Sequence, residues 1–348
     1  MVNFKPFTSA YLAETEHREA IEYDKLCEFG ISPLDDALLK IAPGELIVIG
    51  ASSGYGKTEV ALNISRINAR KGLKVAHYNL EGGWIEAIQR MKWRIMCDIY
   101  YSDYKDAHLE LDYRSWVLMR SKHELLNEIE WKAYEQLKSE IGDNLFLYDS
   151  QEGLRCDTFC ASLLDFQGMD SWARIAEGKG DTVANKKHGF ELDLIVIDHL
   201  HYFSLDKDEN EIQEITAILK KAKQITEQYH IPIILIAHLR KLARGHGMPD
   251  KEDIYGTSNI HKIANTCIII APDHEHDRPN EGIYPTYFRF AKSRQGLRPN
   301  VLINCDFDLN VRSYKDTYHL YKCYPDGSID KKPMEYKEMP RWAKRRVL

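Results

Sequence analysis

The chain has 348 residues, 44% of them hydrophobic, and a formal net charge of -6. No Pro/Gly/Ser-rich linker divides it, so we expect one large α/β core with short extensions rather than two separate domains. The acidic balance does not suggest a dedicated nucleic-acid coat, and we expect any nucleic-acid contact to be a local basic patch.

The cysteines and the hydropathy pattern indicate where the protein works. Of seven cysteines, only Cys156 and Cys160 are close together, at a helical spacing that is not a paired zinc-ligand arrangement. The N-terminus has no signal-peptide core, and no apolar run is long enough to span a bilayer. We expect a protein with no membrane partner that is not secreted, in the cytoplasm or an intracellular compartment of a viral host.

The first two thirds of the chain alternate between strand and helix patterns. Thr8–Phe29 is mixed and charged, either a solvated helix or an arm that docks on a neighbouring subunit. The strands are expected at Glu45–Gly50, Lys74–Leu80, Asn144–Asp149, Leu192–Asp198 and Ile233–Ala237. Helices are expected from Lys57 to a C-cap at Gly72, over Trp84–Met96 and over Glu211–Tyr229. This alternation predicts a mostly parallel sheet flanked by helices.

After residue 265 the pattern becomes β-rich. Strands are expected at Thr266–Ile270, Tyr284–Ser293 and Asn300–Asp306, the last two as a hairpin around Gln295. The polar segment Met169–Gly189 is expected to be a mobile insertion. We therefore divide the chain into an N-terminal arm or linker helix (1–29), a core domain (30–310) and a C-terminal extension (311–348).

The segment ASSGYGKT, Ala51–Thr58, joins a buried strand to a helix, as a phosphate-binding loop requires. Backbone amides of such a loop can surround phosphate oxygens, and here they belong to Ser52, Ser53, Gly54, Tyr55 and Gly56. Lys57 adds a positive charge between the β- and γ-phosphates, and Thr58 offers a hydroxyl to magnesium. The loop predicts ATP and Mg²⁺ as cofactors.

Three more side chains are expected at the same edge of the sheet. Asp198 ends an apolar strand, where its carboxylate would hold magnesium through water. Glu81 directly follows another strand and either orients the attacking water or is a solvated loop residue. His238 ends a third strand, where its imidazole can donate to a phosphate or be a satisfied core residue.

Several motifs resemble those of DnaB-type replicative helicases and of the Twinkle and phage primase-helicases. They are the spacing from Glu81 to Arg90, Ile197-Asp198-His199-Leu200, ILIAHLR ending at Arg240, the segment Asp253–Ala264, and Ala291–Gly296. Their order matches the family's from about Gly30 to about Asp306. The resemblance implies a RecA-like P-loop ATPase that forms a ring, usually a hexamer, and moves along single-stranded DNA.

The resemblance also assigns roles. It implies that Glu81 activates water, that Arg90 couples the site to the rest of the motor, and that His238 senses the γ-phosphate. It implies that Lys292 and Arg294 reach into a neighbour's ATP. The residue pattern alone does not say whose ATP they contact, and an exposed basic strand is the alternative. Cations aimed at transferred phosphate oxygens can accelerate hydrolysis by roughly 10³- to 10⁵-fold.

The loop after His238 is the predicted DNA contact, because Arg240, Lys241 and Arg244 could track a phosphate backbone. A solvated surface loop is the alternative. Since only a short segment precedes the core, we expect no priming domain and a separate primase or loader as a further partner. Two other functions fit the residues: a recombinase-like or clock-like ATPase without unwinding activity, and a structural ring subunit that uses nucleotide as glue.

Overall fold

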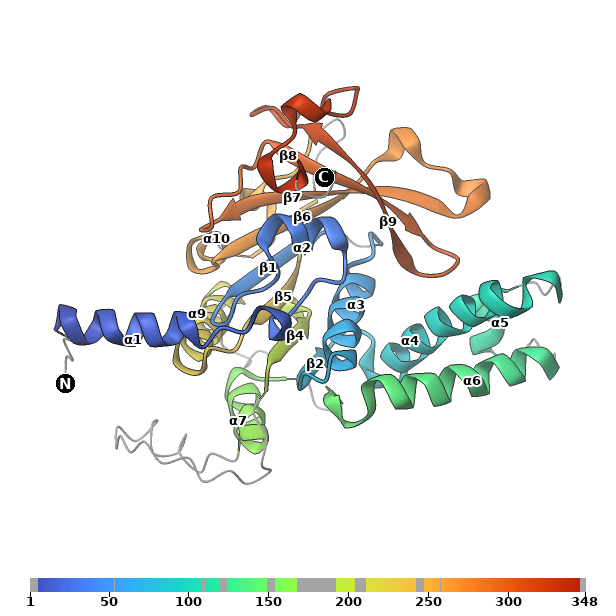
Figure 1. Ribbon diagram of the computed structural model, residues 1–348, viewed down its shortest axis with the longest axis horizontal. Coiled ribbons are helices and arrows are strands. Elements are labelled where there is room, and N and C mark those ends of the chain that lie inside the picture. The colour runs from blue at the N-terminus through green and yellow to red at the C-terminus, as the bar shows by residue number, and fades with distance from the viewer. Residues whose placement is uncertain are drawn as a thin grey trace.

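The computed structural model describes residues 6–52, 54–107, 111–118, 124–148, 154–167, 192–203, 211–241, 247–256 and 258–344. Within these ranges the chain forms a nine-stranded mixed sheet with the order β3-β2-β4-β5-β1-β6-β7-β8-β9 (Figure 1). The predicted insertion Met169–Gly189 lies outside the described residues. Among the described helices, none is both long and apolar enough to cross a membrane.

Six strands pair in parallel and form the half of the sheet that carries the phosphate loop. They are β1 (Leu46–Ala51), β2 (Val75–Asn79), β3 (Leu145–Leu147), β4 (Leu194–Asp198), β5 (Ile233–His238) and β6 (Thr266–Pro272). Except for β3 at the edge, their residues are almost all buried, as continuous apolar runs covered on both faces require. All six were expected from the sequence.

The other half of the sheet is antiparallel. It consists of β7 (Ile283–Ser293), β8 (Val301–Asp308) and β9 (Ser313–Lys322), and the pairing of β7 with β8 confirms the predicted hairpin. The strand β9 was not expected, because its middle residues are charged and exposed and break the apolar pattern. The boundary proposed at residue 310 thus falls in the turn between two paired strands.

Helices cover both faces of the sheet. On one face, α2 (Ser32–Leu38) and α3 (Lys57–Arg70) pack on the side chains of Ile47, Ile49 and Ile234. On the other, α7 (Cys156–Gln167), α9 (Glu211–Tyr229) and α10 (Asn259–Ile263) pack on Leu46, Val48 and Leu235. The alternation of neighbouring strand residues between two separate cores is the period of two that a strand imposes.

Other helices lie further from the sheet. Between β2 and β3, α4 (Gly83–Ile99), α5 (Tyr113–Val117) and α6 (Glu124–Ile141) form a third core around Trp93 and Trp116. In Figure 1 they extend to the right of the sheet, and α1 (Phe7–Glu19) projects to the left, away from the body. The short α11 (Arg341–Lys344) contacts α2 near the end of the chain.

Candidate nucleotide site at the carboxyl edge of the sheet

The phosphate loop connects β1 to α3 in a conformation that two glycines make possible. Gly54 and Gly56 have φ angles of 86° and 72°, the left-handed region that other residues rarely adopt. The turn aims the start of α3 at the loop, and Lys57, the first residue of that helix, is 5% exposed. Burial lowers the pKa of Lys57, and the nearby carboxylates of Glu81 and Asp198 oppose that shift. Ser53 lies outside the described residues.

Asp198 is completely buried beside the loop at the end of β4. Neither of its carboxylate oxygens makes a full hydrogen bond within the described chain. Burial raises its pKa to about 6, although the Thr58 hydroxyl and the Lys57 ammonium lower it. A buried carboxylate with two free oxygens is incomplete without a cation, so Asp198 and Thr58 fit the oxygen ligands that magnesium requires.

A cavity of about 310 Å³ opens in front of the phosphate loop. Lys57, Thr58 and Glu81 form part of its wall, and the side chain of Glu81 is 40% exposed. Asn79, two residues before Glu81, pairs in register with Asp198, so β2 and β4 end side by side. The expected convergence of the loop, Glu81 and Asp198 is therefore present in the fold.

His238, the last residue of β5, is half-buried at the same edge. It pairs in register with Ala51, the residue that opens the phosphate loop. Burial lowers its pKa to about 4, and Lys57 and His201 contribute, so the imidazole is neutral near pH 7. A neutral imidazole can still donate one hydrogen bond to a phosphate oxygen.

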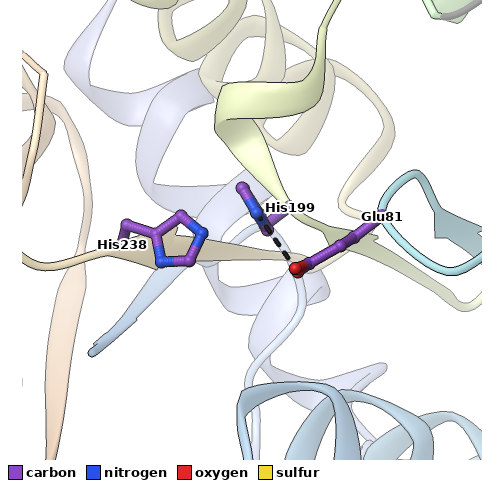
Figure 2. A group of neighbouring side chains, drawn as sticks. All are labelled: Glu81, His199 and His238. Carbon is purple, nitrogen blue, oxygen red and sulfur yellow. Dashed lines mark ion pairs between the residues drawn. The ribbon is translucent and has the colours of Figure 1, made fainter. Parts of the chain in front are cut away.

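His199 completes this group, as Figure 2 shows, although the sequence did not single it out. Its Nε2 lies 3.3 Å from Oε2 of Glu81, and its ring meets that of His238 edge to face at 4.1 Å. Burial lowers its pKa to about 3, with His238, His201 and Lys57 adding to the effect. Its sequence signal was its place in the motif Ile197-Asp198-His199-Leu200, directly after Asp198.

The group Glu81, His199 and His238 has ligand atoms within 4.8 Å of one another, close enough to hold a metal ion. The backbone N–H of His201, however, donates to Nδ1 of His199 at 3.3 Å. A neutral ring whose Nδ1 accepts a hydrogen bond carries its proton on Nε2. The atom facing Glu81 is thus a donor, which disfavours a metal ion at this position.

Arg90 links the cavity to α3 and α4. Its guanidinium contacts the carboxylates of Glu59 and Glu86, and Nε donates to Glu86 at 2.7 Å. Burial alone would lower its pKa, but the two carboxylates raise it. Glu59 also accepts a hydrogen bond of 2.6 Å from Arg312. Arg90 therefore belongs to a charge network on one wall of the cavity.

Further lining of the cavity comes from the antiparallel part of the sheet. Phe307, Leu309 and Arg312, from β8 and the turn that follows, line the cavity, and a side chain added at Gly56 would approach the Tyr314 hydroxyl at 3.1 Å. The sequence did not predict these residues. Their place depends on how far β8 extends, which no local motif specifies.

Lys292 and Arg294 lie at the end of the sheet where the parallel strands begin, opposite the carboxyl edge. The backbone N–H of Arg294 donates to Asn265, and Asn265 donates in turn to Leu46 at the start of β1. From Leu46 to Ala51 the strand rises by about 17 Å, further than an arginine side chain reaches. Arg294 is exposed and borders a separate cavity with Lys220 and Lys223. Neither residue can reach the nucleotide cavity of its own chain.

The predicted DNA-contact residues are described only in part. Arg240 and Lys241 are exposed directly after β5, and the backbone N–H of Arg240 donates to Asp253 at 2.7 Å. Arg244 lies outside the described residues. Arg240 and Lys241 therefore lie at the same edge of the sheet as His238.

Residues 178–316 match the family model described as the DnaB-like helicase C terminal domain. The chain is 22% identical over 305 residues to the replicative DNA helicase DnaC of Bacillus subtilis (strain 168), covering 86% of this chain and 58% of the relative. It is 23% identical over 319 residues to the replicative DNA helicase DnaB of Mycoplasma pneumoniae, covering 86% and 57%. The chain thus spans less than two thirds of these relatives.

Two solved structures share the fold. One, described as an ATPase domain, has a TM-score of 0.66 at 16% identity, and the match covers 90% of this chain and all of that one. The other, a DnaB-like replicative helicase described with its interactions with primase, has a TM-score of 0.64 at 15% identity and covers 90% and 67%. These matches confirm the expected α/β, RecA-like fold and the resemblance to DnaB-type motor domains.

Proposed function

Because the chain shares its fold and motif order with DnaB-type replicative helicases, we propose that it is a ring-forming ATPase that moves along single-stranded DNA and unwinds duplex DNA during replication. One observation carries the proposal. Lys57, Thr58, Glu81, Asp198 and His238 come from four separate segments that end together at the carboxyl edge of the sheet, where the first three line one cavity.

Each of these residues has a part in hydrolysis that its environment supports. Lys57 would bind phosphate oxygens, and Thr58 and Asp198 would hold magnesium, which would neutralise phosphate charge. Glu81 faces the open cavity, where its carboxylate can orient a water and accept its proton. The neutral His238 donates to the γ-phosphate and loses that partner after hydrolysis. Since β5 leads directly to Arg240 and Lys241, loss of this hydrogen bond can change how these two residues contact DNA.

The separation between Arg294 and the cavity of its own chain supports assembly. The cation can act on ATP only if a second copy presents its carboxyl edge to the amino edge of the first. Such a head-to-tail contact is heterologous, and its repetition gives a ring when the rotation between neighbouring subunits closes. We propose a hexamer, as the family resemblance implies. The exposed Phe7 and Tyr11 of α1 support its role as an arm that docks on a neighbour.

A primase or a loader is proposed as a further partner. One structural relative is described together with its interactions with primase. None of the sequence motifs described above is assigned to contact with a primase or a loader. Copurification of the ring with the primase and loader of its own replication system tests this part of the proposal separately.

Unwinding of a forked DNA duplex tests the main proposal. With ATP and Mg²⁺ we expect a displaced strand, and none with Lys57→Ala. A recombinase-like or clock-like ATPase would hydrolyse ATP and bind DNA without displacing a strand. Electron microscopy with single-stranded DNA and a non-hydrolysable ATP analogue should show the ring, with DNA in its channel and Arg294 at the neighbour's nucleotide.

A further inference from the structure

The imidazole of His199 has one orientation, because it is enclosed on two sides. The residue is completely buried, and its ring meets those of His238 and Tyr202 edge to face, at 4.1 Å and 4.6 Å. A ring packed in this way cannot turn over without displacing its neighbours. Its two nitrogens therefore keep distinct partners.

The backbone fixes which nitrogen carries the proton. The N–H of His201 can only donate, so Nδ1 of His199 accepts, and the proton of the neutral ring lies on Nε2. Within the described chain, Nε2 has no full hydrogen bond, and the atom facing it is Oε2 of Glu81 at 3.3 Å (Figure 2). A buried donor without an acceptor is costly in free energy. A hydrogen bond from Nε2–H to Glu81 is therefore favoured over an arrangement in which Nε2–H has no acceptor.

We propose that His199 is a positioning residue, whose Nε2–H holds the carboxylate of Glu81 toward His238 and the γ-phosphate site. This inference rests on the proposed ATP hydrolysis. Glu81 is partly exposed on the turn Glu81-Gly82 that precedes α4, so without a partner its side chain would sample several rotamers. A small rotation of Glu81 completes the hydrogen bond, and such contacts commonly tighten when substrate binds.

Two amide variants separate positioning from general packing. In His199→Gln the amide nitrogen can occupy the place of Nε2, whereas in His199→Asn the shorter side chain reaches only the place of Nδ1. We expect His199→Asn to lower kcat about 10- to 100-fold, since small displacements of a reacting group have effects of this size. His199→Gln should recover kcat to within a few-fold of wild type. The affinity for ATP, measured with a fluorescent analogue, should be unchanged in both.

A matched control is His77→Gln, which replaces another fully buried histidine on β2, away from the cavity. It should lower the thermal midpoint without changing kcat. A second measurement uses only wild-type protein, so this test does not require the variants to fold. In wild-type protein labelled with ¹⁵N-histidine, the ring of His199 should show the Nε2–H tautomer.

The outcomes are distinguishable. Equal kcat for His199→Asn and His199→Gln, a change in ATP affinity alone, or the Nδ1–H tautomer would overturn the positioning role. In each case wild-type turnover would leave the proposed function intact. Absence of turnover in the wild-type ring on single-stranded DNA would instead refute the proposed function, and this inference with it.

Discussion

The ammonium of Lys292 donates a hydrogen bond of 2.6 Å to the carbonyl oxygen of Ala264, just beyond the end of α10. It also donates to His261 at 2.6 Å and to Lys262 at 3.3 Å, so its three donors are directed at helix-end carbonyls. A cation at this end of a helix is favourable. Lys292 and Arg294 are therefore not equivalent, although the sequence treats them as a pair.

We expect the two substitutions to separate stability from turnover. Lys292→Met leaves the carbonyls without their charged donor and should destabilise the fold by about 1 to 3 kcal/mol. Arg294→Ala changes an exposed side chain and should alter stability by less than about 0.5 kcal/mol. Denaturant unfolding and turnover of the folded ring measure both. Loss of turnover on Lys292→Met without loss of stability would restore Lys292 as a direct contact of ATP.

The assignment of Arg294 to a neighbour's ATP predicts complementation. Rings that contain only Lys57→Ala subunits should have no ATPase activity. In rings that contain only Arg294→Ala subunits, kcat for ATP hydrolysis should fall roughly 10³-fold or more. Mixed rings should regain part of it, because some interfaces then combine an intact Lys57 with an intact Arg294. Arg298→Ala, an exposed arginine four residues away, is the control and should need no complementation. Mixtures that stay inactive would contradict action across the interface.

The role of Glu81 predicts a separation of binding from chemistry. Glu81→Gln keeps the size of the side chain but cannot accept a proton from water. We expect ATP affinity within a few-fold of wild type and a turnover lowered about 10²- to 10⁴-fold, the range for loss of a general base. Glu86→Gln, on the same cavity, serves as the comparison. A structural ring subunit that uses nucleotide as glue would keep its full function after Glu81→Gln.

The sequence predicted the parallel half of the fold well because most strands there are continuous apolar runs. It also predicted the meeting of Lys57, Asp198 and His238, because carboxyl ends of parallel strands share one edge. It could not predict Arg312 or Phe307 in the cavity, since their place depends on the length and register of antiparallel strands. It missed His199 because its role depends on a ring orientation set by packing.

The loop after β5 predicts a change in salt dependence. If Arg240 and Lys241 contact phosphates, replacing both by alanine should reduce the slope of log affinity for single-stranded DNA against log salt. The reduction should be about 0.7 for each lost contact. The exposed pair Lys331 and Lys332 in the C-terminal part is a matched control, and its replacement should leave the slope unchanged. An unchanged slope for Arg240 and Lys241 would remove them from the DNA contact.

His77 predicts how stability depends on pH. It is fully buried on β2, and Nδ1 shares a hydrogen bond of 2.7 Å with the Ser65 hydroxyl. Burial lowers its pKa from 6.5 to about 4. As the pH falls below 6.5, the unfolded chain takes up a proton that the folded chain refuses until about pH 4. Proton binding therefore lowers the free energy of the unfolded state relative to the folded state. The stability that the protein has above pH 6.5 is partly lost on acidification.

Between pH 7.5 and pH 5 this one group should lower the free energy of unfolding by about 2 kcal/mol, by linkage of the two pKa values. Urea unfolding at the two pH values measures the loss, and His77→Gln should reduce it by that amount because glutamine does not titrate. His319→Gln, an exposed histidine on β9, should keep the wild-type dependence. The same loss in wild type and His77→Gln would mean that the imidazole takes up its proton without unfolding.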